Sequence, residues 1–389
     1  MLFKKFFCVF ILSLFVFVNY FSVRAENLDI GNLPANSYTL IEANTGKILT
    51  EKNPDEKMSP ASMTKIMTML LLIEKIEAGD ISLQDMVTAS KHANSMGGSQ
   101  IWLDTGEQMS VEDLLKAVAV NSANDAAVAI AEYVAGSEEN FVGLMNDKAN
   151  ELGMVNSHFC NASGLDADGH FSTARDISIL GKELLKHSMI TKYTSIYMDS
   201  LKDGKIELVN TNKMVRFYEG CNGLKTGTTD NAGSCLCCTA TRNNMTLIAV
   251  SMGSKTSKDR FNTCRALLDY GFSGWELIVP DLSSLNINSI NVINGKKNCV
   301  DVKIESDVSS VLVPKNNSNK IETKLEMDDF VEAPVEHGRC IGNVKCLLEG
   351  KEVLSSKIVV DDNVEKVDFK FLMVEMLKDF FLSNKKFLH

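Results

Sequence analysis

The residues best suited to chemistry are Ser62 and Lys65, which stand three positions apart at the start of an apolar run. Ser59 and Pro60 before them are typical of a helix start, as N-cap and first helical residue. Side chains three apart share one helix face, so the hydroxyl and the amine should be neighbours. Lysine can activate a serine nucleophile when burial or nearby cations lower its pKa. The pair is also typical of an ordinary capped helix whose lysine points into solvent.

Two later stretches offer partners for this pair. Ser122 and Asn124 stand two positions apart and supply a second hydroxyl and an amide. Lys225, Thr226 and Gly227 supply a second lysine, another hydroxyl and a glycine that permits close approach. Ser-x-x-Lys, Ser-Asp-Asn and Lys-Thr-Gly, in this order, mark penicillin-binding proteins and class A β-lactamases. The second motif reads Ser-Ala-Asn here and keeps both functional side chains, so the three motifs together favour acyl transfer through serine.

From about Ala35 to the C-terminus, the sequence resembles the low-molecular-weight penicillin-binding proteins, the serine-type D-Ala-D-Ala carboxypeptidases. Residues 36–47, 169–176 and 267–272 match that family in addition to the motifs. The resemblance implies removal of the terminal D-Ala from peptidoglycan pentapeptide stems through a serine acyl-enzyme, which limits cross-linking. It also implies that β-lactams acylate the same serine and that no metal or organic cofactor takes part.

The resemblance implies a role for each polar residue of the motifs. Ser62 attacks the carbonyl of the terminal amide, and Lys65 takes its proton. Ser122 connects Lys65 with the leaving group and helps to return the proton, while Asn124 orients the substrate backbone. Lys225, on the substrate-binding side, adds a positive field that keeps Lys65 partly neutral. We therefore expect Ser62, Lys65 and Ser122 to be the catalytic residues.

Further residues are expected to bind the substrate. The resemblance implies an oxyanion hole at the backbone N–H groups of Ser62 and Thr228, where each donor is worth roughly 3 kcal/mol. Thr226 lies where members of the family bind the substrate carboxylate, and Gly227 belongs to the same motif. Arg260 stands where the resembling enzymes carry an arginine for that carboxylate, and a planar guanidinium suits bidentate contacts. The alternative for Arg260 is an ordinary surface arginine.

The N-terminus predicts export. Residues 1–25 have the features of a secretory signal peptide: Lys4 and Lys5, an apolar stretch over 6–18, and a small-x-small cleavage site at 23–25. An uncleaved anchor is the alternative. The remaining chain carries 37 basic and 50 acidic residues, a net charge of −13. This balance argues against nucleic acid as a partner and against a polybasic membrane patch.

Strand and helix patterns predict two folded domains. Alternating strands over 37–50 and between 205 and 252 flank a mainly helical middle, which indicates an α/β sandwich with an antiparallel sheet over residues 26–273. Short strands separated by Asn, Gly, Lys and Asp indicate a small all-β domain over residues 274–362. The all-β domain carries no catalytic constellation, so the chemistry is assigned to the first domain.

The C-terminal segment, residues 363–389, is predicted to be an amphipathic helix, with the helical pattern starting at Val364. Its large apolar residues recur at helical spacing; they are Phe369, Leu372, Met373, Met376, Leu377, Phe380 and Phe381. Charges interrupt it too often for a transmembrane span. We expect it to lie on the outer face of the cytoplasmic membrane, and the alternative is a helix packed on a core.

Nine cysteines follow the signal segment, an odd number for an exported chain. Cys235, Cys237 and Cys238 lie in a strand-like apolar run, where alternation puts Cys238 on the face opposite the other two. They are interpreted as small core residues; a zinc site is the alternative, although no second pair has ligand spacing. Cys340 and Cys346 are too far apart to bridge on one continuous strand, unless the chain turns between them. Free thiols are therefore expected.

Three other functions share part of this pattern. A class A β-lactamase needs a glutamate for deacylation, and the pattern Glu-x-x-Leu-Asn is absent between Asp125 and Leu224. A D,D-endopeptidase stays open, because it uses the same chemistry. A non-catalytic wall-binding protein should have lost Ser62, Lys65 or Lys225, and all three are present. His170 is interpreted as structural, since a lysine-based mechanism needs no histidine.

Overall fold

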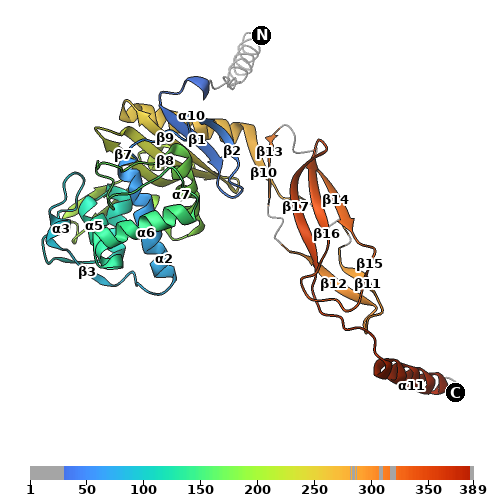
Figure 1. The fold of residues 1–389 in the computed structure, drawn as a ribbon. Helices are drawn as coiled ribbons and strands as arrows, with labels where there is room; N and C mark the ends of the chain where they lie inside the picture. Colours follow the sequence, from blue (N-terminus) through green and yellow to red (C-terminus); the bar gives the residue numbers. More distant parts are fainter. Residues whose placement is uncertain are drawn as a thin grey trace, which may run out of the picture. The chain divides into compact units, whose positions relative to one another are not determined.

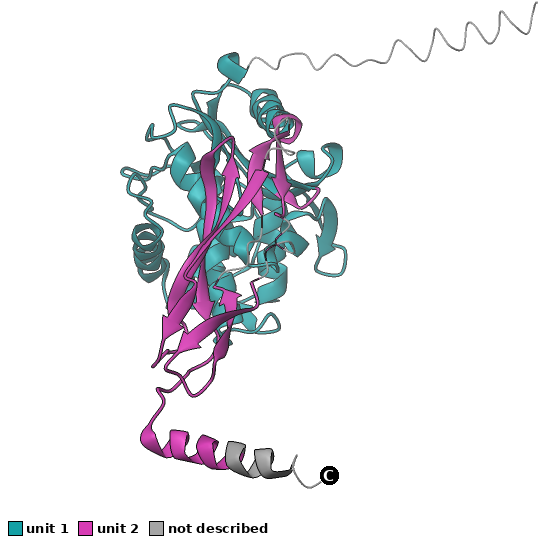
Figure 2. Cartoon of the chain, turned by 90° about the vertical axis from the view of Figure 1, so that its right-hand side faces the viewer, with its two compact units in different colours: residues 1–242, 246–271 teal, residues 243–245, 272–389 magenta. Residues whose placement is uncertain are grey.

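The computed structural model describes residues 30–385, apart from positions 281, 283, 284, 286, 306–309 and 316–320 (Figure 1). The predicted signal peptide, residues 1–25, lies outside the described residues. The chain divides into two compact units, which are coloured separately in Figure 2. Unit 1 comprises residues 1–242 and 246–271, and unit 2 comprises residues 243–245 and 272–389. All residues of the three motifs belong to unit 1.

Unit 2 is built of strands, as the sequence predicts. A six-stranded sheet has the order β14-β16-β17-β12-β11-β15, and β10 pairs with β13 in a separate two-stranded sheet. Neighbouring strands are antiparallel in every described pairing of unit 2 except β11 with β15. The strands are β10 (Trp275–Ile278), β11 (Ser289–Ile293), β12 (Cys299–Ile304), β13 (Val311–Pro314), β14 (Ile321–Met327), β15 (Phe330–Glu332), β16 (Cys340–Leu348) and β17 (Lys351–Val360).

Alternation explains the core of unit 2. In β11 and β12 every second side chain is buried, because successive residues of a strand point to opposite faces. Ile290, Val302, Val344 and Ile358 join one apolar cluster from four different strands. β16 runs without a turn from Cys340 to Cys346, as expected for two cysteines that do not bridge. All nine cysteines of the described residues are free thiols.

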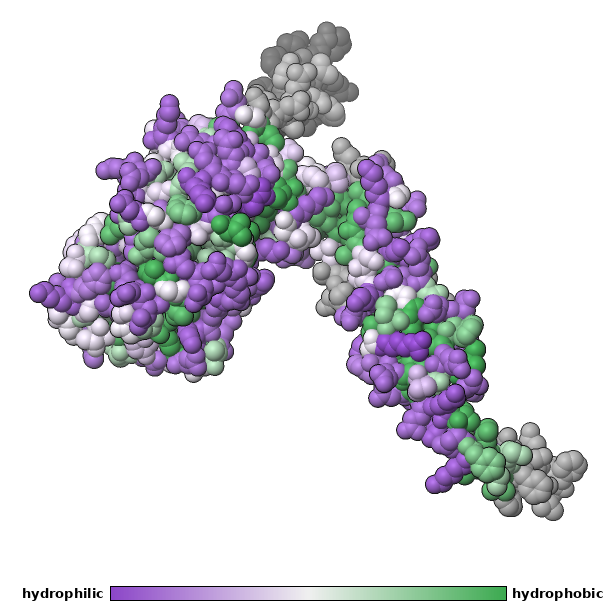
Figure 3. Space-filling model, viewed as in Figure 1, coloured by the Kyte–Doolittle hydropathy of each residue, from purple (hydrophilic) through white to green (hydrophobic). Residues whose placement is uncertain are grey.

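The C-terminal helix α11 spans Phe369–Lys385 (Figure 1). The prediction that it starts at Val364 is wrong, because Val364 pairs with Val335 and is only 2% exposed in the core of unit 2. Phe369 and Met376 on the helix are 79% and 70% exposed. Figure 3 shows hydrophobic atoms gathered on the described turns of α11. No described helix is both long enough and apolar enough to cross a membrane.

Unit 1 contains a five-stranded sheet with the order β2-β1-β9-β8-β7. The β1–β2, β1–β9 and β7–β8 pairs are antiparallel, so the expected antiparallel sheet is present. Strand β7, at one edge, carries the Lys-Thr-Gly motif. The sheet strands are β1 (Ser37–Glu42), β2 (Ile48–Lys52), β7 (Cys221–Thr229), β8 (Gly233–Arg242) and β9 (Met245–Ser254); two small hairpins are β3 (Met86–Thr88) with β4 (Gln108–Ser110) and β5 (Met198–Leu201) with β6 (Ile206–Val209).

In unit 1, the α-helices lie between β2 and β7 in the chain, and one more follows β9. The described α-helices of unit 1 are α2 (Lys65–Glu77), α3 (Lys91–Asn94), α4 (Val111–Lys116), α5 (Asn124–Ala135), α6 (Glu138–Glu151), α7 (Ala174–Lys186), α8 (Ile190–Thr194), α9 (Met214–Phe217) and α10 (Ser257–Gly274). Three shorter turns are the 3-10 turns η1 (Ile30–Asn32) and η2 (Ala61–Thr64) and the π-helical turn η3 (Ala117–Asn121). Long helices form where the sequence shows helical periodicity, and short turns surround the motifs.

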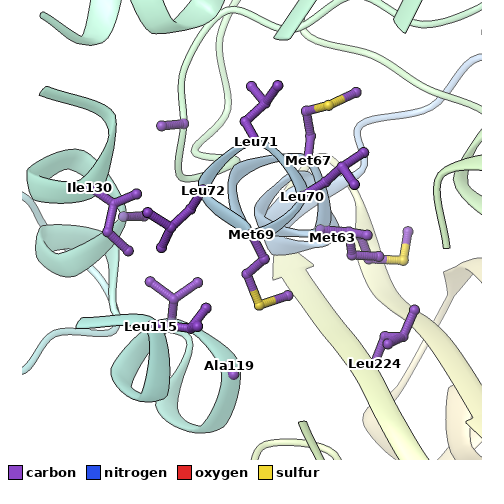
Figure 4. Close-up of a cluster of buried hydrophobic side chains, with 14 of the residues drawn as sticks. Met63, Met67, Met69, Leu70, Leu71, Leu72, Leu115, Ala119, Ile130 and Leu224 are labelled. Carbon is purple, nitrogen blue, oxygen red and sulfur yellow. The ribbon is translucent and has the colours of Figure 1, made fainter. Parts of the chain in front are cut away.

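Helix α2 is the centre of the unit 1 core. Its residues 65–73 are all buried, so it is enclosed on every side, as expected for a helix that is apolar all round. Figure 4 shows Leu72 facing Ile130 and Leu115, which come from α5 and α4. Cys235 and Cys237 of β8 belong to the same cluster, whereas Cys238 does not, which agrees with the predicted alternation. The motif helix is therefore held from several sides.

This enclosure predicts a large loss of stability for Leu72→Ala. The side chain is fully buried, and truncating such a leucine costs about 2–5 kcal/mol through lost transfer free energy and the cavity left behind. The measurement is the free energy of unfolding from chemical denaturation. Leu144→Ala on α6 is the matched control, since Leu144 is 38% exposed and should cost less than half as much. Equal losses would show that α2 is not the centre of the core.

Candidate active site

Ser62 lies in the turn η2, directly before α2. The preceding residue, Ala61, adopts a left-handed backbone conformation with φ of 48°. No side chain caps this turn, so the predicted N-cap role of Ser59 is wrong. Ser62 is half-buried, while Lys65, the first residue of α2, is completely buried. The two residues therefore sit at the junction of turn and helix, with the hydroxyl at the surface and the amine beneath it.

The Lys65 amine contacts three oxygen atoms. Its Nζ donates to Ser62 Oγ at 3.1 Å, to Asn124 Oδ1 at 2.6 Å and to the Ser163 carbonyl at 2.5 Å. Burial lowers the pKa of Lys65 well below its ordinary value; the charge of Lys225 lowers it further, and Asp125 opposes both effects. The amine is thus placed and tuned to accept the proton of the Ser62 hydroxyl.

Lys225 is the second buried amine of the site. It is 1% exposed, and its Nζ donates to the Thr226 carbonyl at 3.0 Å. Burial, together with the positive charge of Arg260, lowers the pKa of Lys225 to about 7. Near neutral pH, this lysine therefore changes between its charged and neutral forms, and its charge acts directly on Lys65.

Ser122 lies between the π-helical turn η3 and α5, and Asn124 is the first residue of α5. Ser122 is buried and lies in the left-handed region with φ of 64°, which is uncommon for a residue with a side chain. Asn124 accepts from Lys65 and donates from Nδ2 to the Gly97 carbonyl at 2.7 Å. Within the described residues, the Ser122 hydroxyl makes no hydrogen bond to Lys65, so the contact expected for proton return is not formed in this geometry. Asn124 takes that place beside the amine.

Strand β7 brings its glycine against the turn η2, which carries Ser62. A Cβ at Gly227 would lie 2.8 Å from the Pro60 carbonyl oxygen and 3.2 Å from the Ser62 backbone nitrogen. Thr226 is buried and donates to the Thr211 hydroxyl at 2.7 Å, whereas Thr228 is exposed. Glycine is required at position 227 because any side chain would push β7 away from Ser62.

Arg260, on α10, lies behind the end of β7. It is 7% exposed, so the alternative of a surface arginine is wrong. Its Nη1 donates to the Gly227 carbonyl at 2.8 Å and to Thr228 Oγ1 at 2.7 Å. Its Nε has no hydrogen-bond partner among the described residues, and burial lowers its pKa. The guanidinium therefore supports the strand that carries the third motif.

Two contributors, Asp125 and the Ser163 carbonyl, were missed by the sequence reasoning. Asp125 is buried and accepts from the backbone N–H groups of Ile101 and Leu103 as well as Ala126. It is the carboxylate whose charge raises the pKa of Lys65. The Ser163 carbonyl binds Lys65, and no side-chain pattern could reveal a backbone acceptor about a hundred residues away in sequence.

His170 supports the site from behind, as its interpretation as a structural residue predicts. Its Nδ1 accepts from the Cys160 backbone N–H at 3.0 Å, which leaves Nε2 to donate to Thr64 Oγ1 at 2.8 Å. Burial lowers the pKa of His170 to about 4, so the ring is neutral at ordinary pH. In the described part of the chain, no group of three or more His, Cys, Asp or Glu side chains could hold a metal ion.

Comparison with known proteins identifies the group to which this geometry belongs. The family model described as D-alanyl-D-alanine carboxypeptidase matches residues 22–256. The chain belongs to this family. A second model, the C-terminal domain of penicillin-binding protein 5, matches residues 284–366, which correspond to most of the strand-built part of unit 2. The carboxypeptidase family, its α/β fold and its β-rich C-terminal domain, all expected from the sequence, are confirmed.

Similar proteins match most of this chain, including both of its domains. The chain is 41% identical over 338 residues to D-alanyl-D-alanine carboxypeptidase DacF of Bacillus subtilis, which covers 86% of this chain and 87% of the relative. Penicillin-binding protein 5 from Haemophilus influenzae has a similar structure, with a TM-score of 0.76, 33% identity and coverage of 86% and 98%. Penicillin-binding protein D2 from Listeria monocytogenes, solved in its ampicillin-bound form, is 32% identical with a TM-score of 0.57 and coverage of 62% and 98%. The expected serine-type carboxypeptidase activity is thereby confirmed as that of the family.

The buried lysine pair predicts a specific pH effect of Lys225→Met. A base must be neutral to accept a proton, so acylation of the serine rises as pH increases through the pKa of Lys65. Removing the Lys225 charge takes away one cause that lowers this pKa. The acid limb of the pH profile for acylation by a fluorescent penicillin should therefore move to higher pH.

The control for this prediction is Lys91→Met, which removes the same charge from an exposed position on α3. It should leave the acid limb in place. An acid limb that stays at the wild-type pH in Lys225→Met would show that the charge of Lys225 does not set the pKa of the base.

Proposed function

We propose that this protein is a penicillin-sensitive D-Ala-D-Ala carboxypeptidase in which Ser62 is the nucleophile and Lys65 its base. The observation that carries the assignment is the 3.1 Å contact between Ser62 Oγ and a Lys65 amine whose pKa is lowered by burial. Ser62 Oγ attacks the carbonyl between the last two D-alanines while its proton passes to Lys65. The C–N bond then breaks, D-alanine leaves with a proton, and water hydrolyses the acyl-enzyme.

The remaining motif residues are assigned by where they lie. Ser122 is the second hydroxyl near the amine, and its lack of a hydrogen bond to Lys65 leaves it available to the leaving group. Asn124 holds Lys65 and can present its amide to the substrate backbone. The backbone N–H groups of Ser62 and Thr228 form the oxyanion hole in this proposal, supported by the close approach of Gly227 to the nucleophile turn.

The substrate carboxylate is assigned to the end of β7. Thr226 and Thr228 offer hydroxyls there, and Lys225 with Arg260 supplies positive charge from beneath. Arg260 is buried and already bonded to Thr228, so its attraction for a carboxylate acts mainly through that threonine. This arrangement favours peptides that end in a free carboxylate, which is the feature of a pentapeptide stem.

Ser62→Ala tests the assignment. The variant lacks the nucleophilic oxygen, so covalent labelling by a fluorescent penicillin and release of D-alanine from diacetyl-Lys-D-Ala-D-Ala should both vanish. Mass spectrometry of the wild-type adduct should place the penicilloyl group on the peptide that contains Ser62. Thr68→Val on α2 is a control, because it removes a buried hydroxyl whose hydrogen bond, within the described residues, goes to the Ala162 carbonyl. Labelling that survives in Ser62→Ala would overturn the assignment.

We further place the enzyme on the outer face of the cytoplasmic membrane, held by α11. The predicted signal peptide would deliver the chain, and α11 then offers exposed apolar side chains at 369, 372, 373, 376 and 377. Each such side chain is worth about 1.5–3 kcal/mol when fully buried in an apolar phase, before ordering costs. The strand-built part of unit 2 carries none of the motif residues, so it acts as the link between helix and enzyme.

The placement predicts the behaviour of a chain that ends after Asp368. This cut removes α11 but keeps Val364, which is part of the unit 2 core. The shortened protein should stay in the supernatant when sedimented with phospholipid vesicles, with an unchanged carboxypeptidase rate.

In the full chain, Leu372→Ser combined with Met376→Ser should weaken vesicle binding, because both side chains are exposed apolar groups. Glu375→Ser on the same helix removes a charge and should not weaken it. A shortened protein that still sediments with vesicles would refute the placement.

A further inference from the structure

One carboxylate outside the three motifs joins separate segments at the rim of the site. Asp166 is exposed on the loop that precedes α7. Its Oδ1 accepts from the Ser59 hydroxyl at 3.0 Å and from the Thr229 hydroxyl at 2.8 Å. Its Oδ2 accepts from the Asn231 backbone N–H at 3.4 Å. A single side chain thus binds the segment just before η2, the end of β7 and the turn after it.

The two hydroxyls are close in sequence to the proposed oxyanion hole. Ser59 precedes Ser62 by three residues, and Thr229 directly follows Thr228. The oxyanion donors, the N–H groups of Ser62 and Thr228, come from these same two segments. Because stabilisation of an oxyanion depends on donor placement, the spacing between the segments matters, and Asp166 spans it.

The loop of Asp166 is itself fixed against the nucleophile turn. Its Ser163 carbonyl accepts from Lys65 at 2.5 Å. Gly164 adopts φ of 82°, and a Cβ on it would overlap the Ala61 carbonyl. The loop therefore cannot drift from the turn without breaking the Lys65 contact, and its carboxylate has a defined position.

The bonding pattern requires an acceptor at position 166. The Thr229 hydroxyl accepts from the Ala232 backbone N–H at 3.1 Å, so its own proton points to Asp166. Two hydroxyl donors and one N–H donor then meet a group that, when ionised, only accepts. An asparagine would keep one oxygen but turn its NH₂ group toward the Asn231 N–H.

We propose that Asp166 is a positioning residue for acyl transfer, which holds the two segments of the oxyanion hole at the spacing required by the developing negative charge. The proposal rests on the roles proposed above for Ser62 and Thr228. Asp166 does not touch the reacting atoms, and it acts through Ser59 and Thr229. The bonds of the oxyanion hole strengthen as negative charge develops in the transition state, so a change in donor placement affects the rate of acylation more than the binding of the β-lactam.

The first test compares Asp166→Ala with Asp168→Ala in the full chain. Asp168 is an exposed carboxylate on the same loop, and its side chain makes no hydrogen bond or ion pair within the described residues. Stopped-flow measurement with a fluorescent penicillin gives the dissociation constant of the initial complex and the acylation rate constant separately. Removal of a whole oxyanion donor lowers the rate about 10²–10³-fold, so a displaced pair of donors should lower it about 10–100-fold for Asp166→Ala. The dissociation constant and melting temperature should stay near the control values.

The second test uses the partner hydroxyl and needs no change at Asp166. Thr229→Val keeps the side-chain shape but removes the hydrogen bonds to Asp166 and from the Ala232 N–H, whereas Thr229→Ser retains both. The valine variant should lose acylation rate, and the serine variant should keep it. Adding Thr229→Val to Asp166→Ala should cause little further loss, because both changes break the same link.

Several outcomes overturn the proposal. An acylation rate constant in Asp166→Ala within twofold of the Asp168→Ala control would do so. Weaker initial binding of the penicillin with an unchanged acylation rate constant would also do so. If Asp166→Ala unfolds, equal rates in Thr229→Val and Thr229→Ser decide against the link. If the penicilloyl group of the wild-type protein is not on Ser62, the proposed function is overturned as well. If it is on Ser62 but the Asp166 and Thr229 variants acylate at the wild-type rate, the positioning role alone is overturned.

Discussion

Three basic side chains buried in one region of the site are the constraint on which the rest of unit 1 depends. Lys65, Lys225 and Arg260 are each less than a tenth exposed. Buried charges are unfavourable unless polar groups surround them. Backbone carbonyls from several segments accept from these cations, and Asp125 supplies a buried negative charge. The same crowding lowers the pKa of Lys65, so the feature that is unfavourable for folding also prepares this amine to accept a proton.

Such a site requires that the elements around it, α2 and β7, keep their positions. The central helix α2 is enclosed by apolar side chains and carries Lys65 at its first residue. Strand β7 is fixed from behind by Arg260 and from within by its pairing with β8. Since neither element can move without exposing apolar surface or separating a buried charge from its acceptors, the mutual repulsion of the cations does not open the site.

The sequence was informative where a pattern is local. Spacing predicted that Ser62 and Lys65 would be neighbours, and alternation predicted the β1–β2 hairpin and the strands of unit 2. It did not predict β7 as a strand, because glycines and polar residues break its alternation and its pairing with β8 is a tertiary effect. Asp125 was missed for a related reason, since its partners are backbone N–H groups of a distant loop. Local rules cannot show which carbonyl or carboxylate folding brings beneath an amine.

The close approach at Gly227 limits how the site can change during evolution. A side chain there meets the Pro60 carbonyl oxygen, which is backbone and cannot rotate away. Thr228, the next residue, is exposed, so space alone does not exclude other side chains there, although its hydroxyl accepts from Arg260. Position 227 is therefore closed to every other amino acid while its neighbour is open. A substitution in this strand that preserves its contact with the Ser62 turn therefore has to occur at a position other than Gly227.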